Sequence, residues 1–251
     1  MTPYAFPLIL SAFLVFCRVG GCLMLMPGFA SSRVPVRVRL LIVLAISLTM
    51  SPLLVPKLYL LVSAEEPARL VQLVFSETAK GMLIGLVGRL FLAAIELAGN
   101  SMAAMAGFSA LPGVPIEGNE PIPALASLMV VSATLFILVL DLHWMVLFMI
   151  ADSYNALPVG DVFEARPSLV VLADKLFETT LLAGRLAAPF IIYSILINLA
   201  MGLTNKLTPQ IPVFFVSLPF ILAGGLFLWW FTVHDALRTF GAAMARWLGG
   251  Y

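Results

Sequence analysis

Residues 169–204 read LVVLADKLFETTLLAGRLAAPFIIYSILINLAMGLT, and this stretch decides the class of fold. It is longer than the roughly 20 residues that a helix needs to cross a membrane. Its apolar residues are nevertheless interrupted by four charged side chains, Asp174, Lys175, Glu178 and Arg185. Because an ionised side chain at the centre of a bilayer costs about 2.5–3.5 kcal/mol, these groups must pair, line a wet cavity or lie outside the hydrocarbon. The stretch therefore predicts a membrane helix that lipid alone does not cover.

The whole chain has the same character. Of its 251 residues, 62% are hydrophobic and only 11% are charged, whereas soluble domains carry about 25% charged residues. This composition predicts a membrane protein, or one whose surface is largely buried by partners. With a formal net charge of +1, nothing suggests nucleic-acid binding, which would need a clustered basic excess.

The order of apolar segments predicts one helical domain over residues 1–251. A shorter amphipathic helix is expected after residue 233. Residues 1–17 contain no Lys or Arg, so the first segment is expected to be a retained helix rather than a signal peptide. The loops show no consistent Lys and Arg bias, so the charge rule assigns no membrane orientation. Segments long enough to approach a membrane span are found at about 4–29, 40–62, 70–98, 122–151, 169–204 and 211–233.

Charged residues within and beside the apolar segments predict contacts between helices. Glu77 and Lys80 are three residues apart, as are Lys175 and Glu178, so each pair shares a helix face. Structural ion pairing is one reading, and a polar passage lined by several helical hairpins is the other. The residues predicted to make inter-helix polar contacts are Arg18, Arg89, Glu96, Asp174, Lys175, Glu178 and Arg185.

Glycine and proline positions indicate how these helices pack. Gly81, Gly85 and Gly88 have the small-residue spacing that lets helix backbones approach closely, and Gly224-Gly225 has the same property. Proline inside a helix kinks or splits it. Kinks or breaks are therefore expected at Pro27, Pro52, Pro56, Pro189 and Pro219.

The longest irregular stretch is residues 107–123, GFSALPGVPIEGNEPIP. Its four prolines make a helix improbable. Irregular backbone at membrane depth is tolerated only where protein covers it or where it lines a cavity. This stretch therefore favours a channel, a transporter or a gate over a passive membrane anchor.

Enzymatic motifs are missing from the sequence. No zinc-protease, nucleophile-elbow, phosphate-loop or dinucleotide pattern occurs, so neither catalysis nor a cofactor is expected. Asp141 and His143 are two residues apart and point to different helix faces, with no further His or Cys ligand nearby, so a metal site is weakly supported. We interpret them as a polar turn at a helix end before Trp144. An intramembrane enzyme that uses this pair is the alternative.

Several motifs, taken in order, resemble the FliR family of flagellar export proteins, which is homologous to the SctT components of type III secretion. Arg18 precedes Met26-Pro27-Gly28-Phe29 and Val34-Pro35-Val36-Arg37, and His143 precedes DSYNALPVG at 152–160. NLAMGLTNKLTPQ at 198–210 is followed by Ser217-Leu218-Pro219. Lys206 replaces the usual Arg, Pro212 stands where a polar residue is common, and the residues after Pro219 favour the flagellar branch. The residues that carry the match are Pro35, Arg37, Asn198, Gly202, Asn205, Pro209, Gln210 and Pro219.

The resemblance implies an all-α membrane protein whose kinked helical hairpins pack into a multi-subunit export gate. Such a gate contains FliP-like, FliQ-like and FlhB-like subunits, lies in the bacterial inner membrane within the flagellar basal body, and passes unfolded flagellar proteins. Membrane lipid is a further expected contact. By analogy residues 107–123 would plug the closed pore, and the expected plug residues are Gly107, Phe108, Leu111, Pro112, Gly113, Pro115, Ile116, Pro121 and Pro123.

Two alternatives stay open at this point. The chain could serve an SctT-type virulence secretion system instead of a flagellum. It could also be a secondary transporter for small solutes, with charged helices forming a site near the bilayer midplane. A transporter should be stable and active alone, whereas a gate subunit should co-purify in a large complex.

Overall fold

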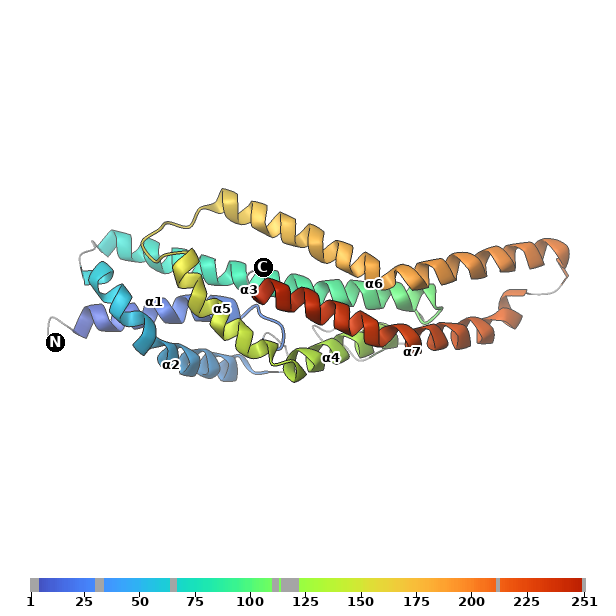
Figure 1. Cartoon of the computed structure of the whole chain (residues 1–251), viewed down its shortest axis with the longest axis horizontal. Helices are drawn as coiled ribbons and strands as arrows, with labels where there is room; N and C mark the ends of the chain where they lie inside the picture. Colours follow the sequence, from blue (N-terminus) through green and yellow to red (C-terminus); the bar gives the residue numbers. More distant parts are fainter. Residues whose placement is uncertain are drawn as a thin grey trace. The chain divides into compact units, whose positions relative to one another are not determined.

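The computed structural model describes residues 5–29, 34–63, 67–109, 113, 122–210 and 213–249. Over these residues the chain forms α-helices and no strand, so the predicted all-α class is confirmed (Figure 1). The helices are α1 (Ala5–Leu23), α2 (Val36–Ser63), α3 (Pro67–Met105), α4 (Ala124–Val139), α5 (Leu142–Ala156), α6 (Ala165–Leu207) and α7 (Val213–Leu248).

Four helices among the described residues are long and apolar enough to cross a membrane. They are α2 over Val36–Val55, α3 over Ala68–Met105, and the whole of α6 and α7. The helices α4 and α5 add a fifth span if they count as one bent span. The apolar part of α1, Pro7–Leu23, is shorter. By length and composition, the chain is an all-α membrane protein.

The apolar segment expected at 122–151 is a bent pair of helices, Ala124–Val139 and Leu142–Ala156, which can count as one broken span. Asp141 has φ 56° in the left-handed region, which asparagine and aspartate tolerate better than other non-glycine residues. Leu140 follows the last residue of α4 as its C-cap, and Asp141 precedes α5 as its N-cap. The interpretation of Asp141 and His143 as a turn at a helix end is confirmed.

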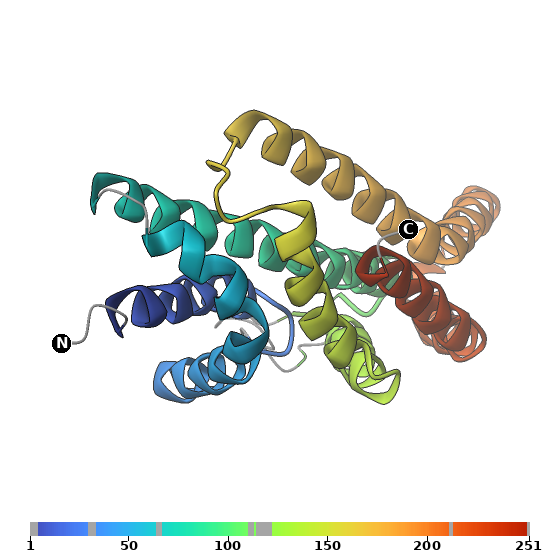
Figure 2. The same cartoon turned by 60° about the vertical axis from the view of Figure 1, so that its left-hand side comes forward.

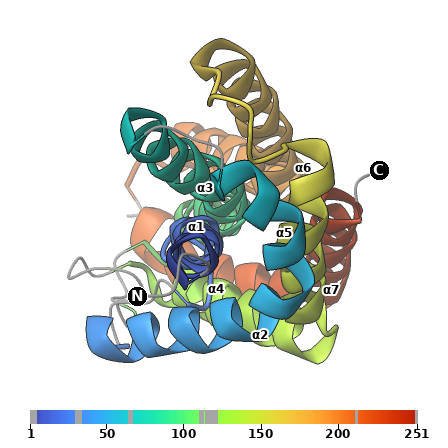
Figure 3. The same ribbon diagram turned by 90° about the vertical axis from the view of Figure 1, so that its left-hand side faces the viewer.

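The helix expected after residue 233 is present, but it is the last part of α7, which is continuous from Val213 to Leu248, so the expected separation from the preceding segment was wrong. A change from apolar to amphipathic composition does not by itself interrupt backbone hydrogen bonding. Pro219 lies inside α7 and Pro189 inside α6 without ending either helix. Figure 1 shows α6 changing direction between its golden and orange parts, and Figure 3 shows α2 bent along its length. The prolines within these helices thus leave them continuous.

The chain divides into two compact units. Unit 1 contains Met1–Leu90, Asp141–Leu176 and Leu248–Tyr251, and unit 2 contains Phe91–Leu140 and Phe177–Trp247. A single domain over residues 1–251 stays a prediction.

In unit 1, α1 lies between α2 and the first part of α3 (Figure 2). The contact between α1 and α3 is formed by glycines. A Cβ atom on Gly81 would overlap the main-chain carbonyl of Arg18, and one on Gly85 would overlap that of Cys22. From the other side, a Cβ on Gly21 would lie 2.6 Å from the carbonyl oxygen of Thr78. The close backbone approach predicted from the glycine spacing is confirmed.

In unit 2, small residues again mark the contacts between helices. A Cβ on Gly225 of α7 would lie 2.6 Å from the Cβ of Ala106, directly after α3. Gly224 lies against the ring of Tyr193 of α6, whose hydroxyl donates a 2.8 Å hydrogen bond to the carbonyl of Ile221. The Gly224-Gly225 pair therefore packs as its sequence predicted.

Candidate functional site

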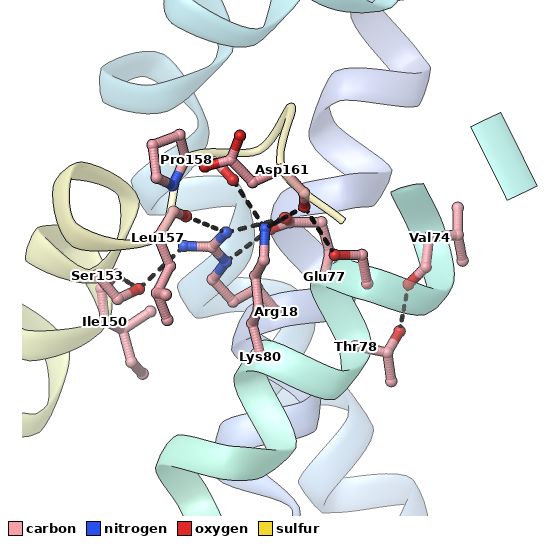
Figure 4. Close-up of polar contacts among 11 residues, drawn as sticks. Arg18, Val74, Glu77, Thr78, Lys80, Ile150, Ser153, Leu157, Pro158 and Asp161 are labelled. Atoms are coloured by element: carbon pink, nitrogen blue, oxygen red, sulfur yellow. Dashed lines mark hydrogen bonds and ion pairs between the residues drawn. The ribbon is translucent and has the colours of Figure 1, made fainter. Parts of the chain in front are cut away.

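A buried ion cluster lies in unit 1 and is centred on Arg18 of α1. The Arg18 and Glu77 side chains are both 0% exposed. The guanidinium Nε donates to Glu77 Oε2 at 2.6 Å and Nη2 donates to Oε1 at 2.8 Å (Figure 4). This two-pronged geometry matches the planar fork of arginine to a carboxylate, and such bidentate pairs are among the strong hydrogen bonds in proteins. It ties α1 to α3.

A second cation, Lys80, completes the cluster one turn along α3. Its Nζ donates to Glu77 Oε1 at 3.3 Å, which forms the i, i+3 pair predicted from the sequence. The same nitrogen donates to the carbonyls of Pro158 at 2.7 Å and Asp161 at 2.8 Å. Each of the three ammonium hydrogens thus has an acceptor, and the segment after α5 is held against α3.

The carboxyl end of α5 supplies acceptors that balance the extra positive charge. Arg18 Nη2 donates to the carbonyl of Leu157 at 2.8 Å, and Nη1 donates to Ser153 Oγ at 3.2 Å. The last carbonyls of a helix lack intrahelical donors and carry a partial negative charge. The groups at the end of α5 therefore help two cations to share the carboxylate of Glu77.

The ring of Tyr154 covers the Arg18 guanidinium, with 3.9 Å between the guanidinium carbon and the ring centroid. Its buried hydroxyl makes no hydrogen bond within the described residues.

We expect Tyr154→Phe to keep full stability, because it retains the cation–π contact and removes only the hydroxyl. Tyr154→Leu should lose about 0.5–2 kcal/mol, the range for a cation–π contact. The half-life of the chain in membranes measures both, and equal loss in the two variants would refute a role for the ring.

Of the charged residues predicted to make inter-helix contacts, the structure places Arg18 alone in this cluster. Arg89 is exposed on α3, and Asp174, Glu178 and Arg185 are exposed on α6. Glu96, Lys175 and Glu178 each have an interaction partner. The expectation that these residues form one set of inter-helix contacts stays a prediction.

Glu77 and Lys80 were not predicted to meet Arg18, and Ser153 and Tyr154 were noted only as part of the family-like stretch DSYNALPVG at 152–160. One signal pointed that way: Arg18 stands in an otherwise apolar helix, so a carboxylate from another segment had to meet it. The main-chain acceptors at Leu157, Pro158 and Asp161 have no side-chain signature that a sequence could show.

A second feature, in unit 2, is the start of the 107–123 loop. The N–H of Gly107 donates to the carbonyl of Ala104 at 3.3 Å, and that of Phe108 donates to Ala103 at 2.8 Å. Gly107 has φ +81°. This pattern is a Schellman motif, in which a glycine in the left-handed region ends a helix and satisfies its last carbonyls. Phe108 is buried, so the loop leaves α3 at a fixed position.

The other end of the loop is fixed as well. The N–H of Gly113 donates to the carbonyl of Ile122 at 2.7 Å, and Pro123 precedes the first residue of α4. A Cβ on Gly113 would lie 2.5 Å from Ser127 Oγ and 2.8 Å from Ala124 Cα, so Gly113 packs directly on the first turn of α4. The expected plug residues Leu111, Pro112, Pro115, Ile116 and Pro121 lie outside the described residues.

The family-motif residues concentrate on exposed parts of the chain. Pro35 accepts the N–H groups of Val38 and Arg39 at the start of α2, where Arg37 is exposed. On α6, Gly202 has nothing within 4 Å of an added Cβ. The other motif residues are exposed on α6, on α7 or in the turn between them, namely Asn198, Asn205, Pro209, Gln210 and Pro219. Packing within the described chain does not explain these residues.

Within the described residues, no group of three or more His, Cys, Asp or Glu side chains could hold a metal ion. Asp141 and His143 stand where α4 gives way to α5, as described above.

The chain is similar in sequence to a family of known proteins. Residues 9–247 match the family described as "Bacterial export proteins, family 1". The flagellar biosynthetic protein FliR of Caulobacter vibrioides is 30% identical, over 86% of each chain. FliR of Bacillus subtilis is 26% identical over 84% of this chain and 81% of its own, and FliR of Aquifex aeolicus is 25% identical over 88% and 84%. The chain therefore belongs to family 1 of the bacterial export proteins, the family of flagellar biosynthetic protein FliR.

Proposed function

We propose that this chain is a non-enzymatic subunit of the flagellar type III protein export gate. It forms part of the pore through which unfolded flagellar proteins cross the bacterial inner membrane, within the flagellar basal body. Its partners are FliP-like and FliQ-like subunits, with an FlhB-like subunit beside them. Membership of the FliR family and the helices long enough to cross a membrane support a membrane-embedded component of the export apparatus.

The observation that carries the multi-subunit part of this proposal is the exposure of α6 and α7. In their candidate membrane-crossing windows only 17% of the α6 residues and 11% of the α7 residues are buried. Asp174 and Arg185 are exposed on α6 among apolar side chains such as Leu181 and Ile192. Ionised groups are costly in hydrocarbon. Neighbouring subunits or a wet conduit, rather than lipid alone, are the surroundings that suit this surface.

The helices α6 and α7 do not fill the space between them completely. A groove of about 310 Å³ lies between the two helices and is lined by apolar residues that include Met201, Val216 and Phe220. The exposed motif residues Asn198 and Gly202 are on the same part of α6. The α6–α7 hairpin therefore combines an apolar groove with exposed residues of the family motif. Such a surface is suited to packing against other helical hairpins.

Residues 107–123 are the proposed pore plug. The loop contains no Lys or Arg and holds four prolines. This composition suits a plug, because proline restricts the backbone and few charged groups would attract a passing unfolded chain. Its ends are fixed at Gly107 and at the Gly113–Ile122 hydrogen bond. Phe108, Leu111 and Ile116 supply apolar side chains in the loop. A barrier to water and ions needs both such apolar side chains and fixed ends.

The anchored ends allow a precise test of the plug. Replacing residues 114–121 with Asn-Gly joins Gly113 to Ile122 through a two-residue hairpin turn and leaves both anchors in place. We expect the assembled complex to be retained and the membrane to leak ions, measured as loss of membrane potential in cells that express the variant. The control variant Glu117→Gln/Glu120→Gln keeps the loop length and its apolar residues and should not leak. An ion-tight membrane with the shortened loop would refute the plug assignment.

The alternative of a small-solute transporter predicts a different outcome. Such a protein would move its solute when reconstituted alone. The gate proposal instead predicts that the chain reconstituted alone transports nothing. It also predicts that the chain purified from its own cells is recovered with FliP-like and FliQ-like subunits.

A further inference from the structure

An apolar groove runs along the α1–α2 pair in unit 1. It consists of two adjoining cavities of about 350 Å³ and 290 Å³ that share Phe16. The first is lined by α1 residues such as Gly20 and by Leu40 and Val43 of α2. The second is lined by Phe13 of α1 and by Leu44, Ser47, Leu48 and Ser51 of α2. The two helices lie side by side in Figure 2.

The groove is apolar even where serines line it. Ser47 Oγ donates a 2.6 Å hydrogen bond to the carbonyl of Val43, and Ser51 Oγ donates a 2.7 Å bond to that of Ser47. Both hydroxyls are therefore satisfied within α2. A molecule in the groove would therefore contact mainly hydrocarbon side chains. The exposed residues Phe13, Leu44 and Leu48 at the rim are of this kind.

The length of the groove matches one leaflet of a bilayer. Leu40 and Ser51 are the first and last groove residues on α2, which at about 1.5 Å per residue corresponds to roughly 16 Å. A bilayer has a hydrocarbon core of about 30 Å, so one leaflet measures about half of that. An extended acyl chain is the membrane component of this length.

One end of the groove is positively charged. Arg37 lies on the same face of α2 as Leu44 and Leu48, because residues seven and eleven positions apart share a helix face, and its side chain is exposed. It stands in the first turn of α2, which contains no acidic residue and carries the partial positive charge of a helix amino terminus. A phosphate group is attracted to both charges.

We propose that this groove binds one acyl chain of an anionic phospholipid, with its headgroup phosphate at Arg37 and the amino terminus of α2. The groove supplies the apolar contact and Arg37 supplies the preference for a negative headgroup. This assignment rests on the membrane location of the chain and not on its role in export. Failure of the lipid test would therefore leave the proposed gate function untouched.

The test uses the full chain in its detergent-extracted complex, reconstituted into phosphatidylcholine vesicles. A phosphatidylglycerol with a photoreactive diazirine in one acyl chain is the anionic probe, and a phosphatidylcholine with the same chain is the neutral one. After illumination, labelled peptides are mapped by mass spectrometry. We expect the anionic probe to label the α1 and α2 residues that line the groove about five-fold more than the neutral probe does.

Two variants and one control sharpen the result. Arg37→Gln should abolish the preference for the anionic probe, whereas Leu44→Trp should reduce labelling of the groove by both probes because it fills the cavity. Arg166 is a matched control, since it is likewise exposed in the first turn of a long helix, and Arg166→Gln should change nothing. Equal labelling by the two probes in the unaltered protein, or no labelling of the groove because a partner subunit fills it in the complex, would overturn the proposal.

Discussion

Replacing Glu77 with Gln is expected to destabilise the chain by about 3–5 kcal/mol, the cost of removing one partner from a buried ion pair. The substitution preserves shape but removes the carboxylate that bonds both Arg18 and Lys80. Both cations are buried, so neither can recover its hydration without opening the contact between α1 and α3. Since whole domains are stable by only about 5–15 kcal/mol, most of the variant should be degraded in the cell.

Pulse-chase measurement of the chain in membranes reads this effect as a shortened half-life. Glu164→Gln is the control, because it makes the same chemical change at an exposed carboxylate of the same unit and should leave the half-life unchanged. If both variants decay at the same rate as the unaltered chain, the cluster does not hold unit 1 together.

Replacing Gly81 with Ala is expected to have the second large effect, a loss of about 1–3 kcal/mol from overpacking. The added Cβ would overlap the main-chain carbonyl of Arg18, and a backbone atom cannot move aside as a flexible side chain can. Any shift of α1 would also disturb the Arg18–Glu77 pair, which depends on the same backbone position. The loss should exceed the gain of roughly 1 kcal/mol that alanine brings to a helix over glycine.

Gly184→Ala separates the two contributions. Gly184 lies within α6, where an added Cβ has nothing within 4 Å, so only the gain in helix propensity applies. Half-lives of the two variants, measured in the chain expressed without its proposed partners, should differ in opposite directions from that of the unaltered chain. Similar half-lives for both would contradict close α1–α3 packing through Gly81.

The sequence predicted those parts of the fold that depend on local pattern. Residues 169–204 correspond to α6 (Ala165–Leu207) because a long, predominantly apolar segment has few alternatives to a helix in a membrane. The spacing of Gly81 and Gly85 predicted a close helix contact, because small residues on one helix face let another backbone approach. The turn at Asp141 was predicted from two polar residues at a helix end, but its left-handed backbone was not, because one such residue leaves the surrounding hydropathy unchanged.

The candidate site could be predicted only in part. Arg18 stood out as a charge in an apolar helix, but its partner depends on the register between α1 and α3, which no local pattern encodes. The acceptors at Leu157 and Pro158 are main-chain carbonyls, so the cluster could be completed only from coordinates.

The native mass of the complex extracted in mild detergent tests most directly whether this chain works as one part of a larger conduit. We predict that the chain will be found in an assembly with FliP-like and FliQ-like subunits, because α6 and α7 leave polar and apolar groups exposed together. A chain recovered as a stable monomer that transports small solutes on its own would contradict the account.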